Sequence, residues 1–337
     1  METVCQTPID SCELYSPKNA SILYLCLLYM HTMKKSLSII ALTFLLVSLP
    51  LYAWNGHGHR TVAAIAWFSL DNQDQQKVTT LLKEHPQYAL TWELEYKQLK
   101  NAPDLGLFLM MRASHWPDDI RDRDHPLSAE HHGNWHYVPS EIHFPDDFKL
   151  EYEEEDVNVI WGIGNAMDQL QDSGLGNDRK AIAMAWLLHL IGDIHQPLHT
   201  ASTFSDALPK GDLGGNKLYL LKDGEPTRLH GYWDDALGEY RDISKAIKQA
   251  KKMIRKHPKS NYPQLTGDKT AADWADESFA LAIEKVHRKG DLVATHIKEE
   301  AQPAPKEYTK MASALSREQG TLGGYRLASY ISKALED

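Results

Sequence analysis

The sequence predicts an all-α fold, with a single helical domain over 54–337 and one small β-hairpin. Apolar residues recur at helical spacings of three and four in most segments of this part of the chain. One segment, 179–195, is apolar on nearly every face, which is typical of a helix at the centre of a core. No internal repeat or clear domain boundary interrupts this region. The composition, 42% hydrophobic and 24% charged residues, excludes a disordered or collagen-like chain.

Residues 33–53 have the layout of a secretory signal peptide. Met33 is followed by two lysines, an apolar run that is short for a membrane span, and a small residue at Ala53. We therefore expect 1–32 to come from an over-extended start, 33–53 to be the signal peptide, and the mature chain to begin at Trp54. The alternative is a longer leader with a genuine extension of 32 residues.

The cysteines support export without disulfides. Cys5, Cys12 and Cys26 all precede Trp54, so the mature chain can form no disulfide and offers no thiolate to a metal. The one N-glycosylation sequon, at Asn19, also lies in the leader. We expect an exported bacterial protein, periplasmic or secreted, with no membrane span after residue 53.

Three helices are expected before a long loop. The first covers 59–69, and Asp71 caps the second, which ends near residue 84. The apolar segment 104–115 predicts the third. Residues 122–156 are rich in His, Pro, Asp and Glu and are expected to form the loop.

Two helices should follow this loop. Asp156 is expected to open the first, in which apolar residues again recur at spacings of three and four. Asp178 is expected to cap the second, the apolar segment 179–195, which Pro197 ends. Because that helix is apolar nearly all round, it should be buried.

The remaining chain predicts a short irregular region and then more helices. Residues 200–228 contain several glycines and a possible hairpin around 218–221. Further helices are expected at about 230–239, 242–257 and 271–288, and a last one follows a Pro-rich link at 302–305.

Two His–Asp pairs indicate a metal site. His189 and Asp193, and likewise His230 and Asp234, are spaced i, i+4, so each pair shares one helix face. His199 follows six residues after Asp193. A buried His or Asp is costly unless it is paired or binds a metal, and zinc accepts both residue types. The alternative is a buried His–Asp hydrogen bond in each helix.

The expected new N-terminus adds a further ligand set. A free α-amino group has a pKa near 8, so that of Trp54 can lose its proton and bind zinc together with its own carbonyl. His59 lies five residues later in WNGHGH and can complete the set.

Several short segments together resemble the S1/P1 nuclease family, zinc-dependent single-strand nucleases of the phospholipase C/P1 nuclease fold. They follow the family's order over essentially the whole mature chain. The segments are WNGHGH at 54–59, HWPDDIR at 115–121, NWHYV at 134–138, HLIGDIHQPLH at 189–199, DLGGN at 212–216, LHGYWD at 229–234 and GYRLA at 324–328.

The resemblance implies three zinc ions. The first would be held by Asp118, His136, His189 and Asp193, the second by His199, His230 and Asp234, and the third by the amine and carbonyl of Trp54, by His59 and by Asp193.

It also implies roles around the metals. Asp118 and Arg121 would act in catalysis, with Arg121 facing the phosphate, and Asn216 matches an active-site asparagine of the family. Tyr137 takes the place of an aromatic residue on which the base stacks. Pro139 stands where the fungal members carry an aspartate that reads the base, so the base preference stays open.

The expected function is therefore an exported zinc-dependent endonuclease. It would hydrolyse single-stranded DNA and RNA to 5′-phosphate products, and also 3′-nucleotides, as a monomer with no protein partner. The net charge of −10 argues against a broadly basic nucleic-acid coat, but three zinc ions would make the site itself positive. The alternatives are a zinc phospholipase C and a non-enzymatic zinc-binding protein.

Other histidines and the tryptophans have plainer interpretations. His131 and His132 are expected to be solvated, and His195 to lie in the core or behind a ligand. The tryptophans expected in the core are Trp67, Trp161, Trp186 and Trp274.

Overall fold

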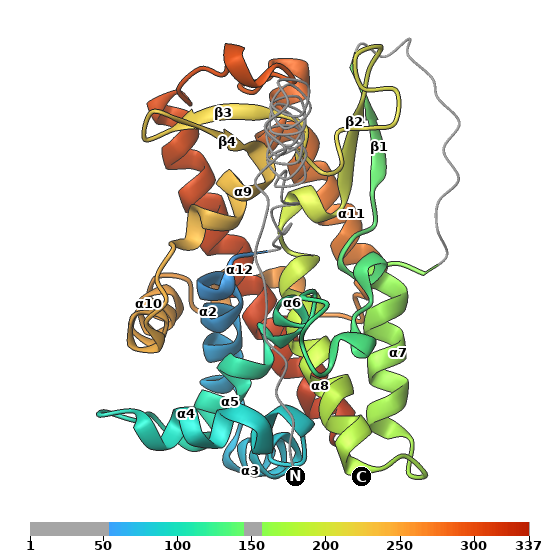
Figure 1. The fold of residues 1–337 in the computed structure, drawn as a ribbon, viewed down its shortest axis with the longest axis vertical. Coiled ribbons are helices and arrows are strands. Elements are labelled where there is room, and N and C mark those ends of the chain that lie inside the picture. The colour runs from blue at the N-terminus through green and yellow to red at the C-terminus, as the bar shows by residue number, and fades with distance from the viewer. Residues whose placement is uncertain (1–53, 145–156, 337) are drawn as a thin grey trace, which may run out of the picture. The chain divides into compact units, whose positions relative to one another are not determined.

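Three helices form the centre of the fold: α2 (Gly56–Trp67), α8 (Asn177–Asp193) and α12 (Lys306–Ala334). Each packs against the other two (Figure 1). The computed structural model describes residues 54–144 and 157–336. The predicted start and signal peptide, 1–53, and the predicted helix-opening Asp156 lie outside the described residues. Helices dominate the described chain, which confirms the all-α prediction.

One group of helices packs beside α2. It comprises α3 (Asn72–Leu82), a π-helical turn (Tyr88–Trp92), α4 (Glu93–Gln98) and α5 (Leu105–Ala113). As predicted, Asp71 caps α3, where its side chain accepts a hydrogen bond from the Asp74 backbone N–H at 2.8 Å. Asp104 caps α5 in the same way.

The predicted loop contains regular structure. It includes two 3-10 turns (Ser128–Glu130 and Gly133–His136) and strand β1 (Ser140–His143), and the short helix α6 (Trp116–Asp119) lies just before it. β1 pairs in parallel with β2 (Ala201–Phe204). This two-stranded sheet was not predicted, because four-residue strands are too short to show a period of two.

Helix α7 (Val159–Gln171) and α8 pack closely together. Asn158 caps α7 by accepting hydrogen bonds from two backbone N–H groups. The prediction that Asp178 caps α8 is wrong, because Gly176 is the N-cap and Asp178 lies in the first turn. A carboxylate is also favourable there, beside the positive end of the helix dipole, so the two positions look alike in sequence.

The second half of the chain adds a hairpin and four helices. Strands β3 (Tyr219–Lys222) and β4 (Glu225–Arg228) are antiparallel, at the predicted place. The helices are α9 (Leu229–Asp234), α10 (Ile243–Lys256), α11 (Ala271–Leu281) and α12. The predicted helices at 230–239 and 271–288 are shorter than expected, since a 3-10 turn (Asp235–Leu237) follows α9 and a π-helical turn (Ala282–Val286) follows α11. Further 3-10 turns cover Lys259–Asn261, Pro263–Leu265, Arg288–Gly290 and Lys298–Glu300.

The core is built largely around α8, whose residues from Ala181 to Asp193 are all buried. Trp67, Trp186 and Trp274 are buried as predicted, but Trp161 is 42% exposed, because it lies on the outer face of α7. Among the described helices, none combines the length and apolar character needed to cross a membrane.

Candidate metal centre

Short elements and helix ends bring eight predicted ligands together. His59 comes from α2, Asp118 from α6, His136 and His199 from two 3-10 turns, and the other four from α8 and α9. All eight are buried: His59, Asp118, His136, His189, Asp193, His199, His230 and Asp234. Their donor atoms form three groups, each closely spaced enough to hold one metal ion.

Asp193 belongs to the group with His59 and His189, and its side chain also contacts His136 of the group that contains Asp118. Its Oδ2 atom is 2.9 Å from His136 Nδ1 and 3.1 Å from His189 Nε2, while Oδ1 is 3.3 Å from His59 Nε2. The two carboxylate oxygens thus face different histidines. Asp193 would therefore be able to offer a separate oxygen to each of two metal ions.

The close approach of α2 and α8 depends on Gly192. A Cβ atom at this position would lie 2.9 Å from His59 Nδ1, which is too close for an ordinary contact. Glycine therefore lets the His59 ring stack on the His189 ring, with centroids 3.9 Å apart.

Asp118 closes one group with His136 and His189. Its Oδ1 atom is 3.8 Å from His189 Nε2 and 2.9 Å from the Arg121 guanidinium. The short helix α6 thus carries the candidate ligand Asp118, and the candidate phosphate-binding Arg121 follows just after the helix.

The third group consists of His199, His230 and Asp234. His230 Nε2 and Asp234 Oδ2 are 3.6 Å apart across one turn of α9. His230 Nδ1 donates a hydrogen bond to the carbonyl of Gly214 at 2.7 Å. Gly214 has a φ of +62°, and a Cβ there would lie 2.5 Å from the Leu198 carbonyl, so the glycine-rich turn is part of the site's frame.

Backbone carbonyls fix the tautomers of three histidines. His189 Nδ1 donates to the Ser114 carbonyl, His199 Nδ1 to the His136 carbonyl, and His230 Nδ1 to the Gly214 carbonyl. These three hydrogen bonds are 2.7–2.8 Å long. A carbonyl can only accept, so Nδ1 carries the proton and Nε2 keeps its lone pair. This is the way metal-binding histidines are usually oriented.

Several buried nitrogen and oxygen atoms at this centre are suited to bind a metal ion. In the described chain, the buried atoms without a hydrogen-bond partner include Nε2 of His136, His199 and His230, both ring nitrogens of His59, and Oδ1 of Asp193. Buried polar atoms are normally satisfied, and so many in one place need an explanation. Imidazole nitrogens and carboxylate oxygens are the donors that zinc prefers, so the residues present fit this metal.

Three of the candidate ligand histidines are held neutral, as metal binding requires. Burial lowers the pKa of His59 to about 4 and that of His136 and His230 to about 3, with nearby positive groups adding to the effect. For His189, burial is outweighed by Asp193 and Asp118, which raise its pKa.

The carboxylates differ from one another. Burial opposes ionisation of Asp118 and Asp193, but positive neighbours outweigh it. Arg121 and His189 hold the pKa of Asp118 well below its usual range, and His189 and His199 do the same for Asp193. Burial instead raises the pKa of Asp234, although a hydrogen bond from Gln196 opposes this. Asp234 therefore has the strongest need for a positive partner.

Gln196 is a residue that sequence reasoning missed. It is fully buried, its amide Nε2 donates to Asp234 Oδ1 at 2.8 Å, and its Oε1 accepts from the Leu198 backbone N–H at 2.7 Å. It thus orients one ligand and the turn that carries His199. Its position between the candidate ligands Asp193 and His199 was the one feature of the sequence that could have indicated this role.

Trp54 packs against the start of α2. The Trp54 side chain is 1% exposed. A Cβ atom added at Gly58, in the first turn of the helix, would lie 2.9 Å from the Cβ atom of Trp54. Asn55 caps α2 and also donates to Asp235 and to the Gly238 carbonyl at 2.7 Å. The chain entering α2 is therefore anchored next to the end of α9.

The three residues predicted to contact a substrate are Arg121, Tyr137 and Asn216. The Tyr137 ring stacks on His199, with centroids 4.7 Å apart, so one of its faces is already covered. Burial and the pairing with Asp118 act in opposite directions on Arg121, and its pKa is raised, so it stays charged. The Asn216 amide donates to the Leu213 carbonyl within its own turn.

Other histidines play supporting parts. His115 lies 3.5 Å from Asp118 Oδ2, and His195 is buried against Arg326, as expected for a core residue. His131 and His132 are not solvated as predicted, since both are partly buried and His132 stacks on Trp135.

Comparison with known proteins agrees with this site. The chain is 27% identical to nuclease P1 of Penicillium citrinum over 65% of its own length and 82% of that protein. It is 27% identical to nuclease S1 of Aspergillus oryzae (61% and 62%) and 29% identical to endonuclease 3 of Arabidopsis thaliana (53% and 64%). The family model described as S1/P1 nuclease matches residues 54–336. The chain therefore belongs to the S1/P1 nuclease family and is a nuclease of the hydrolase class.

Proposed function

We propose that the protein is an exported, zinc-dependent endonuclease that cleaves single-stranded DNA and RNA to 5′-phosphate products and also hydrolyses 3′-nucleotides. The observation that carries this proposal is the set of three buried His/Asp groups with unpartnered donor atoms, in a chain of this family. Zinc, when bound there, would lower the pKa of a coordinated water to about 7 and so supply a nucleophile near neutral pH.

The protein's own residues then position the phosphodiester. Arg121 carries a fixed charge beside Asp118 and can hold the anionic oxygens of the phosphate. Because His199 occupies one face of the Tyr137 ring, we expect a base to stack on the opposite face. Asn216 lies in the glycine-rich turn that also supports His230, and we propose that it contacts the substrate there.

We propose that the third ion needs processing before Trp54. The family match begins at Trp54, and this residue packs against the helical turn that carries His59. A protein produced with Trp54 as its first residue should bind three zinc ions, whereas one with two extra residues before Trp54 should bind two and lose most activity. Equal zinc content and activity in the two proteins would refute a role for the amine.

The decisive assay uses the processed protein. We expect cleavage of single-stranded DNA, RNA and 3′-AMP, its loss on treatment with a chelator, and recovery with zinc. Asp118→Asn should abolish cleavage and lower zinc content, whereas Asp119→Asn, a change of the same kind at a side chain that is 37% exposed, should leave both intact. Hydrolysis of phosphatidylcholine alone would favour a zinc phospholipase C, and zinc binding without hydrolysis a non-enzymatic protein.

Export and a monomeric state complete the proposal. The charge pattern and apolar run at 33–53 support export to the periplasm or medium, and no protein partner is invoked. Cell fractionation and light scattering on the purified protein test these two points.

A further inference from the structure

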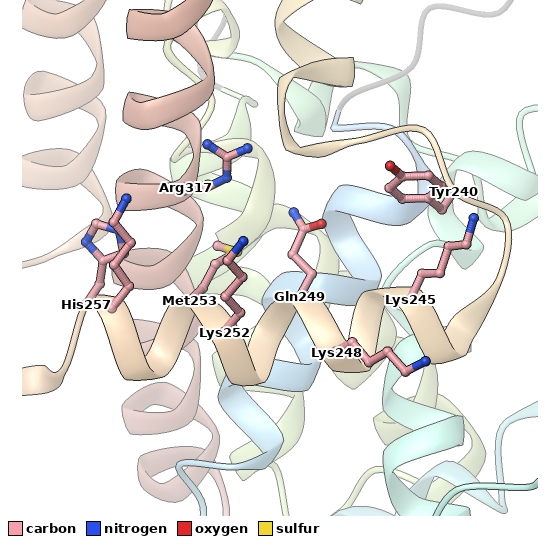
Figure 2. Close-up of a pocket in the computed structure, with 9 residues that line it drawn as sticks. Tyr240, Lys245, Lys248, Gln249, Lys252, Met253, His257 and Arg317 are labelled. Carbon is pink, nitrogen blue, oxygen red and sulfur yellow. The ribbon is translucent and has the colours of Figure 1, made fainter.

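A basic groove lies along α10, outside the metal centre. This 14-residue helix carries six basic and no acidic residues, in a chain whose net charge is −10. Lys245, Lys252 and Lys256 line the groove on one side and Arg317 of α12 lies opposite, as Figure 2 shows for the labelled residues. Within the described chain, none of these four side chains forms an ion pair with a carboxylate.

The shape of the groove suits a strand of nucleic acid. It encloses about 470 Å³, within the range of small-ligand sites. Lys252 and Lys256 are one helical turn apart, about 6 Å along the axis, so they can meet successive phosphates of an extended strand. At the far end, Tyr240 is 48% exposed and offers an aromatic surface beside Lys245, whose ammonium lies 4.2 Å from its ring centroid. Positive side chains combined with an aromatic surface are the usual features of single-strand binding.

The groove lies against α2, the helix that carries the candidate ligand His59. The rings of Tyr240 and His57 meet edge to face, with centroids 5.1 Å apart, and Gln249 of α10 lies 3.1 Å from His57 Nε2. His57 is two residues from the candidate ligand His59 on α2. The buried His57 thus joins the Tyr240 end of the groove to the helix that carries a candidate metal ligand.

We propose that this groove binds the phosphate backbone of a single-stranded substrate beyond the scissile bond, and so favours long strands over short ones. The proposal rests on the proposed nuclease function. Charge complementarity selects the occupant, because the rest of this acidic protein repels a polyanion and this surface does not.

The test compares two double variants with equal loss of charge. Lys245→Gln/Lys252→Gln removes groove charge, and Lys83→Gln/Lys100→Gln removes two exposed lysines elsewhere. Each phosphate contact with a single strand contributes a slope of about 0.7 to the salt dependence of binding. The groove variant should therefore show a slope about 1.4 lower, and about tenfold weaker binding of a long strand near 0.15 M salt. The control should bind like the wild type.

Two readouts separate this proposal from the function on which it rests. Cleavage of a dinucleotide, which has no phosphate beyond the scissile bond, should be the same in all three proteins, while KM for a 30-mer should rise only in the groove variant. Binding of a phosphorothioate 30-mer, measured by fluorescence anisotropy, tests the groove even if no cleavage occurs. Equal effects of the groove variant on dinucleotide and 30-mer, or no effect on the 30-mer, would overturn the proposal. So would loss of binding to phosphatidylglycerol vesicles with unchanged 30-mer binding, since that would assign the groove to a membrane.

Discussion

Single buried residues behind the ligands should control metal affinity. Gln196 donates to Asp234, the carboxylate whose pKa burial raises most clearly in this centre. Gln196→Met keeps the side-chain volume but removes both hydrogen bonds, so we expect the His199–His230–Asp234 site to lose 10- to 100-fold in zinc affinity. Chelator competition on the purified protein measures this. Gln87→Met, at another buried glutamine, should leave zinc affinity unchanged, and equal zinc affinity in the two variants would count against the role of Gln196.

A second residue-scale prediction concerns His85. This side chain is 1% exposed, packs between Trp92 and Trp116, and accepts a hydrogen bond from the Gln87 backbone N–H at 3.0 Å. Burial lowers its pKa to about 3 from the ordinary 6.5, so between these values the unfolded chain binds one proton more than the folded one. Its contribution to stability is therefore complete above pH 6.5 and falls by about 1.4 kcal/mol per pH unit as the pH drops toward 3.

The variant His85→Asn tests the direction of this pH dependence. Asparagine can still accept the Gln87 hydrogen bond but does not titrate. The variant should be less stable than the wild type at pH 7, and the difference in free energy of unfolding should shrink by about 1.4 kcal/mol between pH 6 and pH 5. Urea unfolding at matched zinc concentration measures the difference at each pH. A difference that stays constant over this range would mean that His85 does not titrate in the unfolded chain as assumed.

Helix packing sets the distance between candidate ligands. Gly192→Ala would place a Cβ 2.9 Å from His59 Nδ1 and push α2 from α8, at a cost of roughly 1–3 kcal/mol. It should also lower occupancy of the site shared by His59 and Asp193. Gly164→Ala, on the exposed face of α7 with no atom within 4 Å, should instead stabilise the protein by about 0.5–1 kcal/mol. Thermal unfolding of both variants checks that one change lowers the stability and the other raises it, and zinc analysis checks the occupancy of the site.

The helices and strands differ in how well the sequence predicts them. α8 was predictable because its apolar residues cover nearly every face, and the spacing of His189 and Asp193 follows from helix geometry alone. The short strands β1 and β2 were not predictable, since their pairing joins segments about sixty residues apart. The cap of α8 was wrong by two residues because Gly176 has no side chain that marks it. Gln196 and the carbonyls that orient the histidines became visible only in three dimensions.

At the scale of the whole molecule, the candidate ligands tie distant segments together. The eight residues span from His59 to Asp234 and come from α2, α6, α8, α9 and two 3-10 turns. Without a metal, Asp234 stays buried with incomplete compensation, because the hydrogen bond from Gln196 does not offset the effect of burial on its pKa, and this is unfavourable for folding. The chain from Trp54 onward has no cysteine, so no disulfide within it can replace these links. Zinc should therefore be a major source of stability as well as of activity.

Metal removal tests this last point on the intact protein. A site filled at a thousandfold excess of zinc over its Kd adds about 4 kcal/mol to the free energy of unfolding. Dialysis against a chelator should lower the midpoint of thermal unfolding by several degrees for each ion lost, and added zinc, but not magnesium, should restore it, because the ligands are mainly imidazoles. An unchanged midpoint after measured loss of zinc would show that the His/Asp groups fold as ordinary hydrogen-bonded pairs and that the metal serves chemistry alone.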